Sequence, residues 1–501
     1  MKKIKHIFIL SLALFSIASC SDYLDINEDP NNPQAESLNP DLILPAALTG
    51  PFSTFTSTGN YLGNSMMQNW AGDVTSVTGG FVEEFTLTGI DNTFYAGIWD
   101  GLFSSTANLT AIINTDFPNY ENHIAVAKIM RAFYFQYLVD LYGDIPFTEM
   151  HQFQENLTPA YDDAESVYRA LLQDLTDAVD LINNNTNLDT EELADADVVF
   201  AGNMAMWEKF ANTIKLRILL RESLRTTGDA SFVSNQIAAL SGQPLLGAGE
   251  TVTINPGYSN DAGKQNPYFA SYGEDSGGNA TFNRDFIRAA DYAVQFLNGS
   301  TNGIFDNRIN GIYEAESGFA ILGIVQGETN DTATPNSARI GPSLVISSEQ
   351  DGILMTSSES LLLQAEAAEY YGFPGSGLDY FQQAITDSFA FHGLAMGTYM
   401  TDIETDNGTI DGEGLGWNTT TDKREAIMTQ KWIALNGING LESFVEYTRT
   451  GYPDVPLAIN ASRPARFIRL LYPQSEYISN SANVPQQSNS DMFSVPVFWN
   501  E

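Results

Sequence analysis

The sequence has one cysteine among its 501 residues, so it forms no intrachain disulfide and no cysteine-based metal cluster. It has four histidines, and none lies in an H-E-x-x-H arrangement, so a helical zinc site is unsupported. It also lacks a G-x-S-x-G elbow and a G-x-x-x-x-G-K-[ST] loop. The motifs that identify common metalloenzymes, serine hydrolases and nucleotide-binding enzymes are therefore missing.

Positive charge is scarce as well. The chain has 23 Lys and Arg against 62 Asp and Glu, a net charge of −39 at pH 7. Such a surface repels phosphate backbones, which argues against binding to nucleic acid or to an anionic membrane surface. It suits neutral or cationic ligands, and it disfavours acidic polysaccharides unless calcium or a local Arg/Lys cluster screens the repulsion.

A long apolar run occurs at the N-terminus, in MKKIKHIFILSLALFSIASC. Three early lysines precede the apolar stretch Ile7–Ile17, which is shorter than the ~20 residues of a membrane-spanning helix. The run ends in Ile-Ala-Ser-Cys, the form of a bacterial lipobox. We therefore expect residues 1–19 to be a lipoprotein signal peptide and Cys20 to carry the lipid. The alternative is an ordinary secretory signal with a chance cysteine.

The rest of the chain predicts a soluble, mainly α-helical body. Hydrophobic residues make up 43% of the sequence, which is ample for a large core. Residues 20–40 are acidic and rich in Asn and Pro, so we expect a lipidated tether there and one folded domain over 41–501. Apolar residues at helical spacing predict long helices, the last with a basic outer face, at 124–142, 163–182 and 204–225.

A helical pair is predicted at 358–391, where Gly372 and the following FPGSG break two amphipathic segments. Large side chains opposite small ones across a short turn are typical of tetratricopeptide-type hairpins. Strand signals are few and short, at 81–88 and 250–254. The fold class expected is thus a single domain of tetratricopeptide-like helical pairs.

Long irregular stretches rich in Gly, Asn, Asp and Thr occur at 241–283, 299–340 and 393–421. Compact domains rarely keep such long loops without a use, so we expect them to supply a binding surface. Aromatic rings among polar and glycine neighbours suit the stacking of neutral sugars. The candidate ligand-binding residues are Trp70, Tyr268, Tyr272 and Trp417. The competing interpretation is that each ring pins its loop to the core.

One acidic loop has a calcium-like spacing. Residues at the first, third, fifth and twelfth positions of DIETDNGTIDGE match an EF-hand loop, namely Asp402, Glu404, Asp406 and Glu413. Asn407 stands where the turn glycine belongs, and the flanking sequence does not supply two convincing helices. The hypothesis is therefore a structural Ca²⁺ site, with a solvated acidic loop as the alternative and no other cofactor expected.

Several segments in order resemble the SusD/RagB family of Bacteroidetes outer-membrane lipoproteins, and its SusD-like subgroup more closely. They begin at Cys20 with SDYLDINEDPNNP and continue through AKIMRAFYFQYLVDLYGDIPF, WEKFANTIKLRILLR and ILMTSSESLLLQAEAAEYYG. The most diagnostic part is REAIMTQKWIALNGINGLESFVEYTRTGYPDVP, followed by RPARFIRLLYPQSEYISN. Each segment is short, but together they cover nearly the whole mature chain.

The resemblance implies a lipid-anchored protein at the cell surface that captures oligosaccharides and delivers them to a SusC-like TonB-dependent transporter. Some relatives handle peptides instead, so a peptide ligand is the alternative. The resemblance implies no catalytic activity. The two catalytic carboxylates of a glycosidase can lie anywhere in a sequence, so a glycoside hydrolase is a third, less favoured hypothesis.

Overall fold

The structure is a computed structural model that describes residues 39–73, 81–152, 155–328 and 336–501. The predicted signal peptide, Cys20 and nearly all of the predicted tether lie outside these described residues. The long helices of the described part are α2 (Pro40–Thr54), α5 (Ala96–Ile113), α6 (Glu121–Tyr142), α7 (Ala164–Asn184), α8 (Met204–Arg221), α9 (Ala230–Ala239), α14 (Ser357–Tyr371), α15 (Gly377–Phe391), α17 (Lys423–Leu435) and α18 (Gly440–Thr450).

Short elements connect them. The short helices and turns are η2 (Phe55–Gly59), α3 (Asn60–Met66), α4 (Val82–Thr86), η3 (Ala194–Ala196), α10 (Pro267–Tyr272), α11 (Phe282–Phe286), α12 (Asp291–Leu297), α13 (Ile309–Ile312), α16 (Tyr399–Asp402), α19 (Gln474–Ser479), α20 (Asp491–Ser494) and η5 (Phe498–Asn500). The strands are β1 (Trp70–Gly72), β2 (Val252–Ile254), β3 (Ile287–Ala289), β4 (Tyr313–Glu314), β5 (Arg339–Ile340) and β6 (Gly352–Met355). They pair antiparallel as β1–β3, β2–β6 and β4–β5.

Helix α7 shows how the sequence specifies these elements. The Asp163 side chain caps the first turn by accepting a hydrogen bond from the Ser166 amide. Val167, Leu171 and Leu175, spaced by four, are buried along one stripe. The helix predicted at 163–182 is thus confirmed. Helices α6 and α8 confirm those predicted at 124–142 and 204–225.

The predicted pair at 358–391 is confirmed by α14 and α15, which pack against each other. Gly372 ends α14 with φ 68°, a left-handed conformation that glycine adopts without a Cβ penalty. The Ser376 side chain then accepts a hydrogen bond from the Asp379 amide and begins α15. The mainly helical, tetratricopeptide-like fold class follows from such pairs.

One strand prediction is wrong and one is confirmed. Residues 81–88, predicted as a strand, form α4, flanked by Phe81 and Leu87 in the left-handed conformation. Phe81 and Phe85 stack with ring centroids 5.0 Å apart, so their four-residue spacing follows a helical period. The strand predicted at 250–254 is present as β2, paired with β6.

The basic outer face predicted for α8 is also wrong. Arg217 and Arg221 are completely buried, because α8 packs against α6, α7 and α14 and has little free surface there. Arg221 lies 3.1 Å from Asp140, 2.7 Å from Glu442 and 2.9 Å from Glu446. Burial alone would lower the pKa of Arg221, but these carboxylates together raise it well above its ordinary value.

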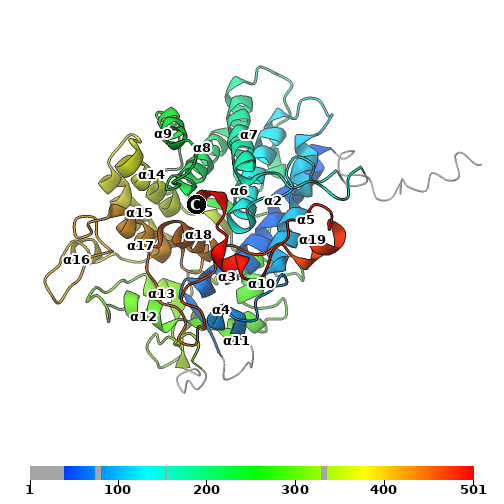
Figure 1. The fold of residues 1–501 in the computed structure, drawn as a ribbon. Coiled ribbons are helices and arrows are strands. Elements are labelled where there is room, and N and C mark those ends of the chain that lie inside the picture. The colour runs from blue at the N-terminus through cyan, green and yellow to red at the C-terminus, as the bar shows by residue number, and fades with distance from the viewer. Residues whose placement is uncertain (1–38, 74–80, 153–154, 329–335) are drawn as a thin grey trace, which may run out of the picture.

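Figure 1 shows the long helices α6–α9 and α14–α15 in its upper and left parts, and the short elements α4 and α10–α13 below them. We call the helices α5–α8, α14, α15, α17 and α18 the helical scaffold. Most buried apolar residues form one main core that includes the buried faces of these helices. A smaller, separate cluster lies among the short elements. The loop-rich part therefore has its own apolar support.

Candidate ligand-binding site

The smaller cluster gathers three of the four predicted aromatic residues. Trp70 and Tyr272 have ring centroids 5.0 Å apart, and Tyr268 and Tyr272 have centroids 4.8 Å apart. Phe81, Phe85 and Phe286 belong to the same cluster, which we call the second aromatic cluster. Segments more than 200 residues apart in the chain therefore meet in this cluster. The sequence did not predict this meeting, because each ring was identified only from its own neighbours.

All three of these rings are buried. Trp70 and Tyr272 are each 1% exposed, and Tyr268 is 6% exposed. Trp70 lies in β1, opposite Ala289 of β3, and the Tyr272 hydroxyl donates a 2.7 Å hydrogen bond to the Ser57 carbonyl. These large buried rings support the loops that carry them. Their packing therefore agrees with the competing interpretation, in which each ring pins its loop to a core.

Trp417 lies elsewhere. It is 7% exposed, belongs to the main core and packs on Phe381 with ring centroids 5.3 Å apart. Its backbone amide donates to Glu404, and its carbonyl accepts from Lys423. The structure therefore does not bring Trp417 together with the other three aromatic candidates.

The four predicted calcium ligands are not brought together either. Both oxygens of Glu404 accept backbone hydrogen bonds, from Trp417 and Asn418, at 2.9 and 2.7 Å. Asp402 accepts from the Thr398 hydroxyl at the start of α16. No group of three or more acidic or histidine side chains able to hold a metal ion occurs within the described ranges. Asp402, Glu404, Asp406 and Glu413 thus lack the converging geometry that Ca²⁺ requires.

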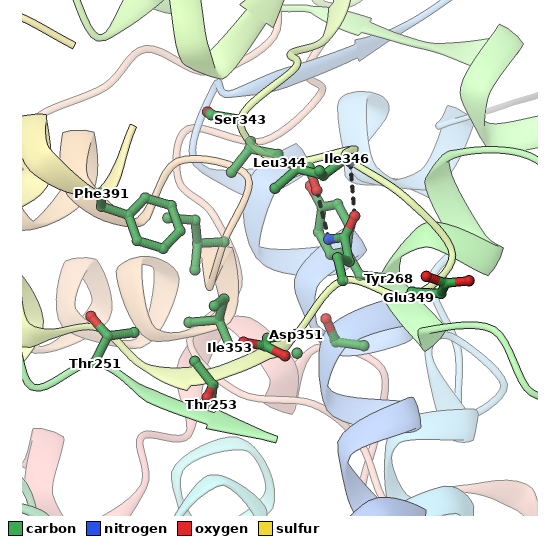
Figure 2. A pocket seen from close by; sticks show the side chains of 14 residues that line it. Thr251, Thr253, Tyr268, Ser343, Leu344, Ile346, Glu349, Asp351, Ile353 and Phe391 are labelled. Atoms are coloured by element: carbon green, nitrogen blue, oxygen red, sulfur yellow. Dashed lines mark hydrogen bonds between the residues drawn. The ribbon is translucent and has the colours of Figure 1, made fainter. Parts of the chain in front are cut away.

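A pocket of about 520 Å³ opens beside the second aromatic cluster (Figure 2). This volume lies within the range of about 300–1,000 Å³ typical of ligand pockets. Its apolar wall consists of Leu344, Ile346, Ile353, Phe391 and Ile438. Its polar side chains include Thr251, Thr253, Ser343, Glu349 and Asp351. Figure 2 shows Phe391 and Thr251 on one side, and Ile346, Tyr268 and Glu349 on the other.

The loop on one side of this pocket is held by its own hydrogen bonds. The Gln350 side-chain oxygen accepts from the Ile346 and Ser347 amides, at 2.8 and 3.2 Å. Its nitrogen donates to the Leu344 carbonyl at 2.9 Å. Asn266 ties the same loop to α10 by donating to the Gln350 carbonyl. The pocket wall is therefore ordered without a ligand, which lowers the entropy cost of binding.

A histidine stands behind the pocket. His392 Nδ1 lies 2.7 Å from the Ser343 hydroxyl, which donates to the Gly311 carbonyl. The Ser343 hydroxyl thus links His392 to the Gly311 backbone. Burial, and secondarily the charge of Arg308, lower the pKa of His392 to about 3. The imidazole is therefore neutral at neutral pH and adds no positive charge to the pocket.

Tyr268 is the predicted aromatic residue that lines this pocket. Its hydroxyl is buried and has no hydrogen-bond partner. Burial raises the pKa of Tyr268 far above its ordinary value, so the phenol stays neutral. An unpartnered buried hydroxyl is costly, and a polar ligand atom that reached it would remove that cost.

A second hollow, of about 400 Å³, lies on the other elements of the cluster. Phe282 is 62% exposed there and stacks on Phe286 with centroids 5.3 Å apart, while Arg288 and Arg339 line the hollow beside it. No local pattern in the sequence singled out this exposed ring. The FNRDF segment carries the four-residue Phe spacing, but such spacing is more typical of buried helix faces.

The sequence places acidic residues side by side at Glu83–Glu84 and Asp162–Asp163, and three of these four carboxylates hold structural contacts. Asp163 caps α7, and Asp162 accepts hydrogen bonds from the Phe147 and Thr148 amides, both at 2.8 Å. Glu84 accepts from the Tyr95 hydroxyl at 2.8 Å, and burial raises its pKa. Each of these three groups has a structural partner.

Comparison with known proteins agrees with the fold. Residues 30–473 match a SusD-like family described as "Starch-binding associating with outer membrane". The chain belongs to the SusD-like family. No curated protein matches this SusD-like chain. Its family is one of outer-membrane-associated binding proteins, and no helix in the part of the chain that the structure describes is long and apolar enough to cross a membrane.

Solved structures resemble this SusD-like protein over nearly its full length. A SusD homolog from Bacteroides uniformis is 25% identical, covers 91% of this chain and 99% of its own, and has a TM-score of 0.71. A chitin-binding SusD homolog from Flavobacterium johnsoniae is 20% identical, covers 92% and 97%, and has a TM-score of 0.71. A SusD homolog from Bacteroides fragilis is 19% identical, covers 93% and 100%, and also has a TM-score of 0.71.

Proposed function

We propose that this SusD-like chain is a lipid-anchored cell-surface protein that captures oligosaccharides without cleaving them. It delivers them to a SusC-like TonB-dependent transporter in the outer membrane. Family membership supports glycan binding, and the chitin-binding relative shows that a protein of this fold binds a sugar polymer. The lipobox-like Ile-Ala-Ser-Cys20 sequence supports the anchor.

The observation that carries the proposal is the composition of the pocket. Apolar C–H faces of a sugar would pack against Phe391 and Ile353, while hydroxyls would bond to Thr and carboxylate groups at its edge. No lysine or arginine is found among the described residues that line it. A pocket without cations, on a chain with net charge −39, favours neutral glycans over polyanionic ones.

The test is binding of the purified chain to a panel of neutral polysaccharides by affinity electrophoresis and calorimetry. Removing the Phe391 ring should weaken binding about tenfold, because one aromatic contact contributes ~1 kcal/mol or slightly more. The matched control is Phe305→Ala, which removes a 55% exposed ring outside the pocket. Equal binding by wild type and Phe391→Ala would place the sugar elsewhere.

The reaction mixture from the same experiment decides between binding and catalysis. We expect no shortened oligosaccharides after prolonged incubation with a bound polysaccharide. Released products would favour a glycoside hydrolase. Binding of peptides with no binding of any glycan would favour the peptide alternative.

Anchor and partner are tested in the native membrane. Cys20→Ala should abolish incorporation of labelled fatty acid and release the chain from the membrane. Mild-detergent purification of the wild type should recover a TonB-dependent barrel, since a stable assembly requires an interface of about 2,000 Å² or more. Repeated recovery of the chain alone would contradict the partnership.

A further inference from the structure

The 520 Å³ pocket is lined by two carboxylates, and no lysine or arginine occurs among the described residues that line it. Glu349 and Asp351 line the pocket, and both are exposed at its edge. Asp351 accepts one 2.8 Å hydrogen bond from Asn255, which leaves further acceptor positions on its carboxylate. Neither residue belongs to an ion pair in the described structure, and no lining residue is a lysine or arginine.

Local and long-range fields have the same sign here. The net charge of −39 attracts cations toward the whole surface, and the two pocket carboxylates add a short-range attraction. Salt screens the distant charges beyond about 8 Å, so at physiological ionic strength the local pair decides which ligand is preferred. A neutral sugar gains little from either field, whereas a positively charged one gains from both.

The apolar wall limits what kind of cation fits. Phe391, Leu344 and Ile438 would desolvate a bare metal ion without offering it oxygen ligands. An organic ammonium ion with a compact apolar frame suits both the apolar wall and the carboxylates. Its frame would cover the wall, and its charge would lie next to the carboxylates.

The buried Tyr268 hydroxyl is a second, independent feature. It lacks a partner, and the residue lines the pocket at 6% exposure. A simple alkylammonium would leave this neutral donor unsatisfied, whereas a sugar brings hydroxyl and ring oxygens that accept hydrogen bonds. Thr253 offers a hydroxyl partner near the opposite side (Figure 2), where the Thr251 hydroxyl already accepts a hydrogen bond from the Ser357 amide.

We propose that the pocket binds an amino-sugar unit whose free amine is protonated, with the ammonium at Glu349 and Asp351 and the ring against Phe391. The inference rests on the proposed glycan function and specifies the sugar class within it. A hexosamine monomer is small enough for a 520 Å³ pocket and needs no particular glycosidic linkage. The remaining units of a longer chain would extend out of the pocket.

The test compares three monosaccharides that differ only at carbon 2, namely D-glucosamine, N-acetyl-D-glucosamine and D-glucose. Calorimetry or ligand-observed NMR should show glucosamine binding about tenfold more tightly than glucose, as expected for charge-assisted hydrogen bonds. Equal binding of all three, preference for the N-acetyl sugar, or no binding of any at about 50 mM would overturn the inference.

Two further probes identify what the pocket recognises. Methylamine carries the charge without the sugar and should bind more weakly than glucosamine. Lysine amide carries the same charge on a peptide-like body. Tighter binding of either compound than of glucosamine would overturn the sugar assignment, and the lysine result would point to a peptide ligand.

A charge-matched pair of variants separates the local effect from the long-range one. Glu349→Gln/Asp351→Asn should reduce the glucosamine preference at least about fivefold, because it removes the charge-assisted bonds. Glu192→Gln/Asp195→Asn removes the same two charges from exposed positions around η3 and should leave the preference unchanged. Equal losses in both variants would attribute the preference to net charge and overturn the pocket assignment.

Tyr268→Phe tests the buried hydroxyl, with Tyr134→Phe as its control. The Tyr134 hydroxyl is also buried and unpartnered, but the residue is in the main core and does not line the pocket. Tyr268→Phe should weaken glucosamine and glucose by a similar factor of about 3–10 and spare methylamine. An unchanged affinity for both sugars would overturn the role of this hydroxyl.

Raising the pH tests whether the ligand must carry a protonated amine. Tyr268 and Tyr258, which face this region, have pKa values raised by burial, and the pKa of His392 is lowered to about 3. The preference for glucosamine over glucose should disappear as the amine loses its proton, between about pH 6 and 9.5. A preference that persisted at the higher pH would contradict the ammonium.

These results distinguish the two proposals. Phe391-dependent binding of a neutral oligosaccharide without any glucosamine preference would overturn only the amino-sugar assignment. Absence of binding to every polysaccharide and monosaccharide would contradict the proposed glycan function itself.

Discussion

The helical scaffold and the pocket treat carboxylates in opposite ways. In the scaffold, the buried Glu442 lies 2.7 Å from Arg221 and 2.7 Å from Lys431, and Lys431 also lies 2.9 Å from Glu446. At the pocket, Glu349 and Asp351 have no ion-pair partner within the described part of the chain. Enclosed charges need close counter-charges because water cannot solvate them, whereas charges at a pocket edge keep their water until a ligand arrives.

The same difference appears in the pKa values. Burial would raise the pKa of Glu446, but Arg449, Lys431 and Arg221 overcome that effect and hold it well below its usual value. Burial lowers the pKa of His392 beside the pocket, and the positive charge of Arg308 lowers it further. The surrounding cations therefore keep Glu446 charged, while burial behind the pocket keeps His392 neutral.

The largest effect is expected in the scaffold. Arg221→Met leaves Asp140, Glu442 and Glu446 without one of their counter-charges inside the protein. The free energy of unfolding should fall by about 3–5 kcal/mol, as for other broken buried ion pairs. Chemical denaturation measures this loss directly.

Its control is Arg225→Met, which breaks the 2.6 Å pair with the more exposed Glu165. This variant should cost no more than about 1 kcal/mol. Similar losses for both arginines would mean that the enclosed network contributes no more than a surface pair.

Replacing Trp417 should affect stability but not ligand binding. Trp417→Ala should lower the free energy of unfolding by about 3 kcal/mol, because the buried ring leaves a cavity beside Phe381. Glycan affinity at the pocket should remain within about twofold of wild type, since Trp417 does not line it. Calorimetry on folded protein decides the point, and a tenfold loss of affinity would restore Trp417 as a ligand-binding residue.

A smaller effect is expected from the histidine behind the pocket. Its folded pKa is about 3, below the unfolded value of about 6.5, so the unfolded chain binds more protons between these values. Stability contributed by His392 is therefore present above about pH 6.5 and is lost as the pH falls toward 3. From pH 7 to pH 5 the loss is about 2 kcal/mol.

The measurement is the difference between wild type and His392→Asn in denaturation at several pH values. Other titrating groups are common to both proteins and largely cancel in this difference. The wild type should lose about 2 kcal/mol more than the variant on acidification to pH 5. Identical pH slopes would show that burial does not hold this imidazole neutral.

The local sequence was sufficient to predict most of the helices but not which segments would pack around them. The stripe of Val167, Leu171 and Leu175 predicts α7 because a helix needs only its own residues to form its hydrogen bonds. The strand predicted at 81–88 failed because β-branched and aromatic residues suit strands and short buried helices alike. Only the contact between Phe81 and Phe85 reveals the helical period.

The candidate site was less predictable than the fold. The polar and glycine neighbours of Tyr268 pointed to a residue that does line the pocket, although its ring is buried. Phe391 was missed because a Phe at the end of an amphipathic helix ordinarily belongs to the core. The pocket combines α10, α15, β2, β6 and the loop before β6, which lie far apart in the chain. No local sequence pattern predicts that these segments come together.

The sequence by itself determined the helical periodicity, the excess of negative charge, the absence of catalytic motifs and the family resemblance, because composition and short-range spacing carry each of them. Tertiary structure alone decided that Arg217 and Arg221 turn inward, that Trp70 and Tyr272 support loops, and that the calcium-like carboxylates stay apart. It also placed Glu349 and Asp351 at one pocket, with no lysine or arginine among the described residues that line it. Burial and pairing depend on which distant segments cover a residue, and only the folded chain specifies that.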